Sequence, residues 1–466
     1  MRVIGLDIGT TTLCALALDG ETGEVLHSET VKNDSFLPSP HPWEKLQDPR
    51  RIEALALGLV EALKTRFAPI GGIGLTGQMH GILYLDRDGE PVSPLTIWQD
   101  GRGDQLMADG RSYVQALSAR SGYPLATGYG TVTHFYNGQN GLVPANAVTG
   151  STIHAYLGMR LARRHTPLLH LSDAASWGIT DAVRGDFDRA VMERAGLDPA
   201  FFPSVVLDGE LLGKTADGIP VSPAIGDNQA SFLGAVREME DSILVNVGTG
   251  SQVSVWTPQP ASLPSAEARP CVDGSFLLVG SSLCGGRAFA ALEKFYREVA
   301  ELAGGPVGSL YDGMERQAEA CLHTPGRLMV DTRFSGARQN PALRGGVAGL
   351  GLDNFRPGFL TLGVLEGIVE ELYGFYREME PHLPKKPVRL VGAGNALRKT
   401  RLLQTLFAER FGLPLSIPVH QEEAAYGAAL TALVGAGAAA NIAEAQRIIR
   451  YQPGATAVSN ADKTNI

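Results

Sequence analysis

One pattern occurs twice in the chain, in GLDIGTTTLCALALDG (residues 5–20) and in ILVNVGTGSQVSVWT (residues 243–257). Each stretch reads as an apolar strand, a Gly-Thr turn and a second strand with alternating apolar residues. A single turn of this kind is most often an ordinary β-hairpin. Two copies about half a chain apart indicate instead an ancient duplication, in which equivalent strands open two similar domains.

The pattern between and after these stretches predicts an α/β fold. We expect one domain at residues 1–238 and a second at 239–450, with the boundary near 235–242 and a polar tail at 451–466. Apolar residues at helical spacing predict helices at 51–67, 103–120 and 153–164 in the first half, and at 287–302 and 360–377 in the second. Strands are expected at 71–77, 81–86 and 276–280, and a strand, a Gly-rich turn and a helix in 388–412.

Composition and charge exclude several classes of protein. A hydrophobic content of 44% and a mean hydropathy of 0.00 describe a folded chain rather than a disordered one. The formal net charge of −9 is spread along the sequence without a basic run, which argues against a nucleic-acid surface. No apolar run approaches the roughly twenty residues of a membrane span. Met1 and Arg2 lead directly into a strand-like run, so we expect no signal sequence.

The cysteines favour a cytoplasmic protein. They are scattered and form no paired metal spacing, which is typical of reduced thiols in a long cytosolic chain. Their positions are Cys14, Cys271, Cys284 and Cys321. The sequence leaves the oligomeric state open, and a homodimer is compatible with it.

Gly-Thr turns can bind phosphate, because backbone N–H groups and hydroxyls donate hydrogen bonds and small residues allow close approach. GTTT (residues 9–12) and GTGS (residues 248–251) suit this role. VGAGNALRK (residues 391–399) can seat a nucleotide against a helix N-terminus, although tight packing explains many such glycine turns. Three such turns with no dinucleotide fingerprint favour a nucleotide site. Asp7, just before the first turn, either satisfies that turn or holds magnesium through water.

Two polar motifs suggest a sugar site. GQMHG (residues 77–81) presents Gln78 and His80 between glycines, where they can exchange hydrogen bonds with a polyhydroxylated ligand; a tight turn with a solvated histidine is the alternative. TIWQDGR (residues 96–102) offers an aromatic face beside a carboxylate, a combination that commonly binds sugar hydroxyls, although the tryptophan could be a core residue.

Asp227 in GDNQASF (residues 226–232) has two explanations. It could be the N-cap of the helix that follows, accepting from the first free N–H groups. It could instead be a general base, held at a strand end so that it faces a reacting hydroxyl.

Together, the paired phosphate turns, GDNQAS before the second turn and the late VGAG resemble the FGGY family of carbohydrate kinases, over residues 2–437. The resemblance implies two ribonuclease H-like domains of the actin, hexokinase and Hsp70 ATPase type, with the active site in the cleft between them. GQMHG is shared with ketose kinases. ATGYGT (residues 126–131), GSTIHAY (residues 150–156) and SDAASWG (residues 172–178) are most similar to members that act on sedoheptulose.

The resemblance also implies an activity and assigns residues to it. It favours ATP- and magnesium-dependent phosphorylation of the terminal hydroxyl of sedoheptulose, with xylulose or another pentulose as the alternative substrate. Asp227 is then the general base rather than only a cap. The implied sugar contacts are Gln78, Met79, His80, Trp98, Asp100, Asp227 and Asn228, and the implied nucleotide contacts are Thr10, Thr11, Thr12, Gly248, Thr249, Gly286, Gly394 and Arg398.

A more distant hypothesis is a non-catalytic, actin-like nucleotide switch or sugar sensor. Such a protein would keep the phosphate turns but would need neither a carboxylate at position 227 nor the sugar motifs. It would also hydrolyse ATP without requiring a sugar.

Overall fold

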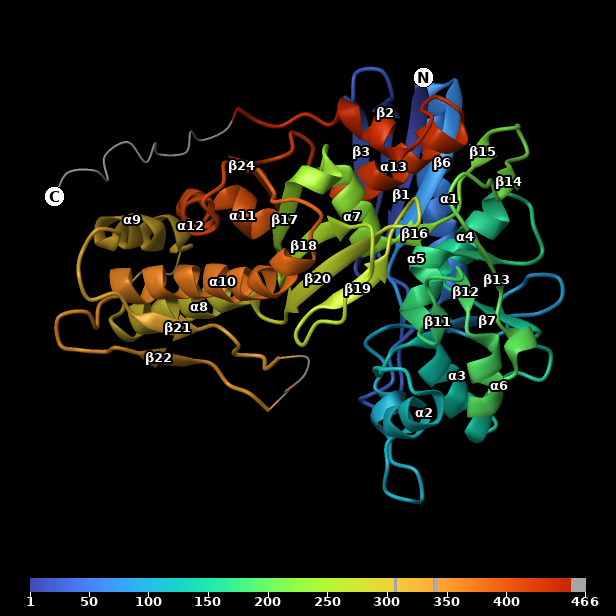
Figure 1. Cartoon of the computed structure of the whole chain (residues 1–466), viewed down its shortest axis with the longest axis horizontal. Helices are drawn as coiled ribbons and strands as arrows, with labels where there is room; N and C mark the ends of the chain where they lie inside the picture. The colour runs from blue at the N-terminus through green and yellow to red at the C-terminus, as the bar shows by residue number, and fades with distance from the viewer. Residues whose placement is uncertain (306–307, 338–339, 341, 454–466) are drawn as a thin grey trace. The chain divides into compact units, whose positions relative to one another are not determined.

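The computed structural model describes residues 1–305, 308–337, 340 and 342–453. Its chain forms two compact units, whose helices and strands are labelled in Figure 1. Unit 1 contains Met1–Arg237, Pro270–Gly274 and Glu422–Ile449. Unit 2 contains the described residues of Glu238–Arg269 and Ser275–Gln421, together with residues 450–453.

The main sheet of unit 1 is built around the first strand of the chain. β1 (Arg2–Ile8) pairs antiparallel with β2 (Thr12–Asp19) and parallel with β6 (Ile70–Gly77). Most residues of these three strands are buried, as expected for strands covered on both faces. The sheet is completed by β3 (Val25–Lys32), β14 (Gly213–Lys214), β15 (Pro220–Val221) and β16 (Ile225–Gly226), in the order β14-β15-β6-β1-β2-β3 with β16 paired to β6.

The main sheet of unit 2 repeats this arrangement. β17 (Ser242–Val247) pairs antiparallel with β18 (Ser251–Thr257) and parallel with β23 (Arg389–Ala393). In each unit three residues join the first two strands, 9–11 and 248–250. The order is β19-β20-β18-β17-β23-β24, with β19 (Glu267–Pro270), β20 (Phe276–Ser282) and β24 (Leu415–Ser416). This shared connectivity confirms the predicted duplicated α/β fold.

Helices pack on both sheets, and short strands form small separate sheets. The helices of unit 1 are α1 (Pro49–Phe67), α2 (Tyr113–Ser121), α3 (Gly130–Gln139), α4 (Ile153–Leu161), α5 (Leu171–Ala174), α6 (Arg189–Ala195), α7 (Asp227–Ala235), α13 (Glu423–Gly435) and α14 (Ile442–Ala445). Those of unit 2 are α8 (Gly285–Leu302), α9 (Tyr311–Cys321), α10 (Pro357–Met379), α11 (Asn395–Lys399) and α12 (Arg401–Phe411). The small sheets pair β4 (Phe36–Leu37), β5 (Leu46–Gln47) and β8 (Leu95–Thr96); β7 (Leu83–Leu85) and β9 (Thr149–Ser151); β10 (Leu168–His170) and β13 (Ser204–Val206); β11 (Thr180–Asp181) and β12 (Asp186–Phe187); and β21 (Met329–Asp331) and β22 (Gly346–Ala348). No helix in the described ranges is long and apolar enough to cross a membrane.

Two predicted helices differ from the structure. The helix expected at 103–120 begins only after Ser112, because this residue caps α2 in a reciprocal pair of hydrogen bonds with Gln115. The helix expected in 388–412 is divided into α11 and α12 at Thr400, whose backbone is extended.

The domain limits also differ from the prediction. The first crossing, after Arg237, falls within the expected range of 235–242, but Pro270–Gly274 and Glu422–Ile449 belong to unit 1 rather than to the second domain. The second segment belongs there because α13 packs on β1, β6 and α7. Within the expected tail, Tyr451 forms a bridge with Pro418, and residues 454–466 lie outside the described residues.

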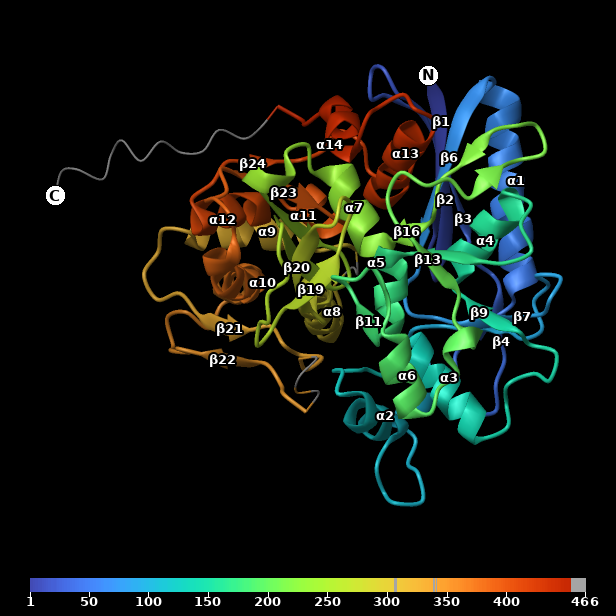
Figure 2. The same ribbon diagram turned by 45° about the vertical axis from the view of Figure 1, so that its right-hand side comes forward.

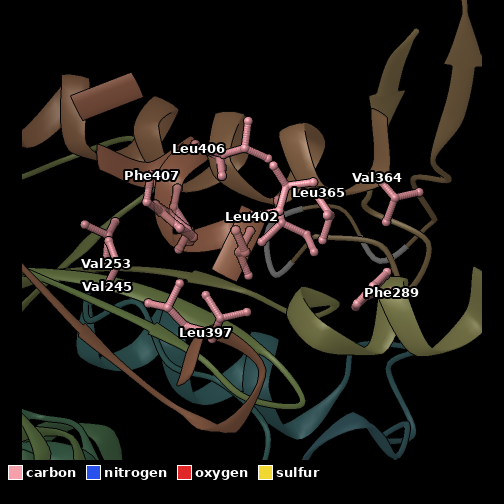
Figure 3. Close-up of a cluster of buried hydrophobic side chains, with 14 of the residues drawn as sticks. Val245, Val253, Phe289, Val364, Leu365, Leu397, Leu402, Leu406 and Phe407 are labelled. Carbon is pink, nitrogen blue, oxygen red and sulfur yellow. The ribbon is translucent and has the colours of Figure 1, made fainter. Parts of the chain in front are cut away.

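Apolar side chains from the sheet and five helices form the core of unit 2, part of which is drawn in Figure 3. Val245 and Val253 extend from β17 and β18, and they meet Leu365 of α10 and Leu402 and Phe407 of α12. Burying one such side chain contributes about 1.5–3 kcal/mol. This core therefore fixes the two strands that carry the second Gly-Thr turn.

In unit 1, α13 lies against the sheet with no side chain between the backbones at two positions. A Cβ atom on Gly5 of β1 would overlap the carbonyl oxygen of Ala425, and one on Gly74 of β6 would overlap that of Ala428. Figure 2 shows α13 beside these strands. Only glycine permits this approach, so the sheet and the helix fit in one register.

The same helix packs against α7 in the same way. A Cβ atom on Gly234 would overlap the carbonyl oxygen of Glu423, and one on Gly427 would overlap that of Ala230. Gln446 adds hydrogen bonds of 3.0 and 2.8 Å to the carbonyls of Leu233 and Val236, at the C-terminal end of α7. Helix α7, which begins at Asp227, is thus held by contacts along its length.

We predict that Gly427→Ala destabilises the protein by about 1–3 kcal/mol or more, because the added methyl group overlaps backbone rather than a movable side chain. Gly58→Ala in α1 is the matched control. Gly58 is exposed and an added Cβ meets nothing within 4 Å, so this change should be neutral or stabilise by up to about 1 kcal/mol. Thermal unfolding of the two variants makes the comparison, and equal melting temperatures would contradict it.

Candidate active site

Three parallel strands of unit 1 end at one edge of its sheet. β6 lies between β1 and β16, with Gly77 opposite Ile8 on one side and Gly226 on the other. The chain continues from these ends into Thr10, Gln78 and Asp227. Ligands of open α/β sheets bind outside the carboxyl ends of such strands. The register therefore collects three of the predicted site residues at this edge.

The first Gly-Thr turn is held by a network of amides. Thr10 Oγ1 donates to Gln78 Oε1 at 3.1 Å and accepts from Trp98 Nε1 at 2.9 Å. Gln47 Nε2 donates to the carbonyl of Thr10 at 2.8 Å, and its Oε1 accepts from Gln78 Nε2 at 2.8 Å. Gln78 is 3% exposed, so its amide mainly orients the turn. Trp98 is 45% exposed and is not a core residue.

The hydroxyl-bearing residues Thr11 and Thr12 continue this turn, and both are exposed. Asn33 Nδ2 donates to the carbonyl of Gly9 at 3.0 Å, and the Asn33 N–H donates to the carbonyl of Thr11 at 2.8 Å. The turn is therefore held from its carbonyl side, and the threonines face solvent.

His80 has a fixed orientation. Its φ of 74° lies in the left-handed region, which is rare for a side chain of this size. The backbone N–H donates to Ser176 Oγ at 3.0 Å, and Nδ1 lies 2.6 Å from the carbonyl oxygen of Ser176. A carbonyl only accepts, so Nδ1 carries the proton. The ring stacks on Tyr129 with centroids 4.7 Å apart. Met79, beside it, is buried against Gly226.

Asp227 is the first residue of α7, and the N-cap is Gly226. The interpretation of Asp227 as the N-cap is therefore wrong by one position. Its side chain is half-buried, and the following Asn228 is buried. A carboxylate in the first turn is favoured by the partial positive charge of the helix N-terminus.

Three carboxylates, of Asp7, Asp227 and Glu422, act on one another electrostatically near this edge of the sheet. Burial, and after it the charges of Asp227 and Glu422, together raise the pKa of Asp7 to about 7, while His154 opposes them. Among the described residues, no group of three or more His, Cys, Asp or Glu side chains is arranged to hold a metal ion.

The structure gives Asp100 a different role from the predicted sugar contact. It is 0% exposed, and one oxygen accepts from Arg102 Nε at 2.7 Å while the other accepts from the Lys45 N–H at 2.9 Å. This internal ion pair arises because Arg102 itself turns inward, donating to Asn137 Oδ1 at 2.6 Å.

In unit 2, three glycines of the predicted nucleotide site come together. The N–H of Gly286, at the start of α8, donates to the carbonyl of Gly248 at 2.9 Å. A Cβ on Gly286 would overlap that same oxygen, and one on Gly394 would overlap the backbone of Val247. Gly394 has a φ of 86° and precedes α11. Two helix N-termini thus adjoin the second Gly-Thr turn, where exposed Thr249 lies.

Arg398 holds a neighbouring loop. Its guanidinium donates to the carbonyls of Pro418 at 2.9 Å and His420 at 2.5 Å. Arg398 therefore has a structural role in holding this loop, and its contact with a nucleotide stays a prediction.

Several residues behind the site were missed by the sequence analysis. Ser176 orients His80, as described above, and Asp173 pairs with His154 at 3.0 Å and accepts from Thr152 Oγ1 at 2.6 Å. Both His154 and Asp173 are 0% exposed. The sequence feature that could have pointed to these residues is the number of polar side chains in GSTIHAY and SDAASWG, which neither an amphipathic helix nor a strand pattern explains.

Comparison with known proteins identifies one family along the chain. Residues 2–234 match the N-terminal domain, and residues 243–436 the C-terminal domain, of the FGGY family of carbohydrate kinases. Sedoheptulokinase of Mus musculus is 27% identical over 478 residues, covering 92% of this chain and 97% of that protein. Xylulose kinase of Streptomyces coelicolor is 27% identical over 466 residues, covering 94% and 89%. The crystal structure of xylulose kinase from Rhodospirillum rubrum has the same fold, with a TM-score of 0.84 at 22% identity and coverage of 98% and 94%.

The raised pKa of Asp7 predicts a pH-dependent stability. The folded chain disfavours ionised Asp7, so the stability that protonation provides is full below about pH 4 and is lost as the pH rises toward about 7. Asp7→Asn removes this penalty. Without divalent cations, we expect the variant to have a higher Tm than the wild type at pH 8 and nearly the same Tm at pH 4.

Asp19→Asn is the control of opposite sign. The N–H groups of Thr22 and Glu21 lower the pKa of Asp19, so ionised Asp19 stabilises the fold above its ordinary pKa and this stability is lost at acid pH. This variant should lower Tm at pH 8. A lower Tm for both variants at pH 8 would contradict the assignment for Asp7.

Proposed function

The chain belongs to the FGGY family of carbohydrate kinases, and on this premise we propose that it transfers the γ-phosphoryl group of ATP to the terminal hydroxyl of sedoheptulose. A member of this family is a phosphotransferase with a sugar hydroxyl as acceptor. The observation that carries the mechanism is the common position of Asp227 and the first Gly-Thr turn at the ends of β16 and β1, on either side of β6.

Asp227 acts as the general base in this proposal. A primary hydroxyl is a poor nucleophile, and the half-buried carboxylate would accept its proton as the oxygen attacks the γ-phosphorus and the bond from that phosphorus to the β-phosphate oxygen breaks, releasing ADP. Transition states of phosphoryl transfer are loose, so most of the acceleration comes from positioning and charge neutralisation. The contacts that fix α7 support this role, because a base must be held within hydrogen-bond reach of the hydroxyl.

Each unit carries a Gly-Thr turn that suits the phosphates of ATP. Exposed threonines of the first turn, and Gly248 with the N-termini of α8 and α11 in unit 2, supply N–H and hydroxyl donors of the kind that phosphate oxygens accept. Asp7 fits a magnesium site held through water, because burial and neighbouring carboxylates disfavour its charge and a cation would relieve them. When bound with ATP, magnesium neutralises charge on the phosphates.

The sugar would lie against His80 and Trp98. With Nδ1–H donated to the carbonyl of Ser176 and the ring stacked on Tyr129, His80 would contact a sugar hydroxyl in a fixed orientation. Sedoheptulose is favoured by the motifs in residues 126–131, 150–156 and 172–178 and by the similarity to mouse sedoheptulokinase. Xylulose is the second candidate, because the xylulose kinase of Streptomyces coelicolor is equally identical at 27%. The scattered cysteines favour a reducing, cytoplasmic setting.

A substrate panel tests the proposed acceptor. We expect ADP formation to depend on sugar, with kcat/KM for sedoheptulose at least about tenfold above that for xylulose, ribulose and glycerol, since two extra carbons add contacts that shorter sugars lack. A higher kcat/KM with xylulose would transfer the assignment to the pentulose. ATP hydrolysis that ignores sugar would favour the nucleotide switch.

Asp227→Asn tests the base. The amide keeps the size of the side chain and removes the proton acceptor, so we expect kcat to fall by about 10²- to 10⁴-fold. Thermal stability and ATP affinity, measured by calorimetry, should change little. A variant that keeps more than about a tenth of wild-type kcat would exclude general-base catalysis by Asp227.

A further inference from the structure

The peptide group between Ile225 and Gly226, one residue before Asp227, is held at both polar atoms by side-chain hydroxyls. Its carbonyl oxygen accepts from Thr76 Oγ1 at 2.8 Å, and its N–H donates to Ser172 Oγ at 3.2 Å. Thr76 and Ser172 are 0% and 1% exposed. β16 has only two residues, so its ladder gives little support of its own.

Ser172 is in turn oriented by His170. Ser172 Oγ lies 2.8 Å from His170 Nδ1, and the Ser172 N–H donates to the same nitrogen at 3.2 Å. Nδ1 therefore acts as an acceptor, and the proton of neutral His170 is on Nε2. Since Ser172 Oγ accepts from the N–H of Gly226, its own hydrogen is directed to Nδ1. The hydrogen bonds of this series, from Gly226 to Ser172 and from Ser172 to His170, are thus both donated in the direction away from Gly226.

This series of hydrogen bonds ends at the carboxylate of Asp208. His170 Nε2 lies 3.2 Å from Asp208 Oδ1, and Asp208 Oδ2 accepts from the Asp273 N–H at 2.7 Å. Burial alone would raise the pKa of Asp208, but the hydrogen bonds from His170 and from the N–H of Asp273 bring it below its ordinary value. Ionised Asp208 accepts a hydrogen bond from Nε2–H and so stabilises this form of His170. A cavity of about 280 Å³ adjoins both side chains.

We propose that Ser172, oriented by His170 and Asp208, is a positioning residue that sets the backbone from which Asp227 reaches the sugar hydroxyl. This inference rests on the proposed role of Asp227 as the base. Without Ser172 the buried N–H of Gly226 loses its acceptor, and the peptide group can rotate about the remaining bond to Thr76. A displacement of about 1 Å at a reacting group can lower a rate by about 10²-fold.

Ser172→Ala tests the proposal by steady-state kinetics with the full chain. We expect kcat to fall about 10- to 100-fold while KM for ATP and sugar changes less than about threefold, because binding groups stay in place. Ser172→Thr keeps the hydroxyl and should recover most of kcat. Ser222→Ala is the matched control, since Ser222 is also buried and donates to the carbonyl of Thr431. It should lower Tm and leave kcat unchanged.

Equal kcat values for Ser172→Ala and Ser222→Ala would overturn the proposal. If Ser172→Ala does not fold, His170→Asn replaces it, because asparagine keeps a cap acceptor but is too short to reach Asp208. The kcat of His170→Asn should be several-fold below that of the wild type, with KM unchanged. A kcat equal to that of the wild type would also overturn the proposal.

Hydrogen–deuterium exchange separates this inference from the proposed function. The amide of Gly226 should exchange at least about tenfold faster in Ser172→Ala than in the wild type, whatever reaction the protein catalyses, and no faster in Ser222→Ala. Faster exchange without sugar-dependent ADP formation by the wild type would refute the kinase assignment alone. Unchanged exchange at Gly226 would refute the positioning role alone.

Discussion

The backbone of α13 touches the backbones of β1, β6 and α7, and the position of the proposed base depends on these contacts. At each contact the residue on one side is glycine, because a single methyl group would overlap a carbonyl oxygen. Interiors packed this closely have few alternative arrangements. Asp227 begins α7, so the register of α13 on the sheet also determines where this carboxylate lies relative to the first Gly-Thr turn. The last helices of the chain are thus needed to complete the first unit.

Two residues of unit 1 are held in unfavourable states, one electrostatic and one conformational. Burial and the charges of Asp227 and Glu422 together raise the pKa of Asp7 to about 7. His80 adds a left-handed backbone. Such local conflicts cost stability and are expected at functional sites, where the rest of the fold must compensate. The compensation here is the close glycine packing and the hydroxyl groups that fix the strand ends.

How far the sequence could predict this structure depends on whether the signal was local. The strand–turn–strand units were predicted because alternating apolar residues and Gly-Thr turns lie within fifteen or so residues. α13 was not predicted, since its sequence EAAYGAAL is small and apolar on every side and its partners are hundreds of residues away. Asp100 was assigned to the sugar because sequence does not reveal that Arg102 turns inward to pair with it. Ser172 and Ser176 were missed for the same reason: their partners, Gly226 and His80, are distant in sequence.

The two halves of the duplication differ in charge at one equivalent position. Asp7 and Asn246 each lie two residues before the glycine of their Gly-Thr turn. In unit 1 the carboxylate adds to the negative charge around Asp227. In unit 2 the neutral amide lies against the turn at Gly394, where a Cβ would overlap its oxygen. Under the proposed function, a carboxylate at position 246 would repel phosphate oxygens from the second turn, whereas the amide leaves neutral donors there and the Asp7 carboxylate suits a cation. Under that proposal the same backbone motif would serve two different tasks, and the two residues differ by a single side-chain atom.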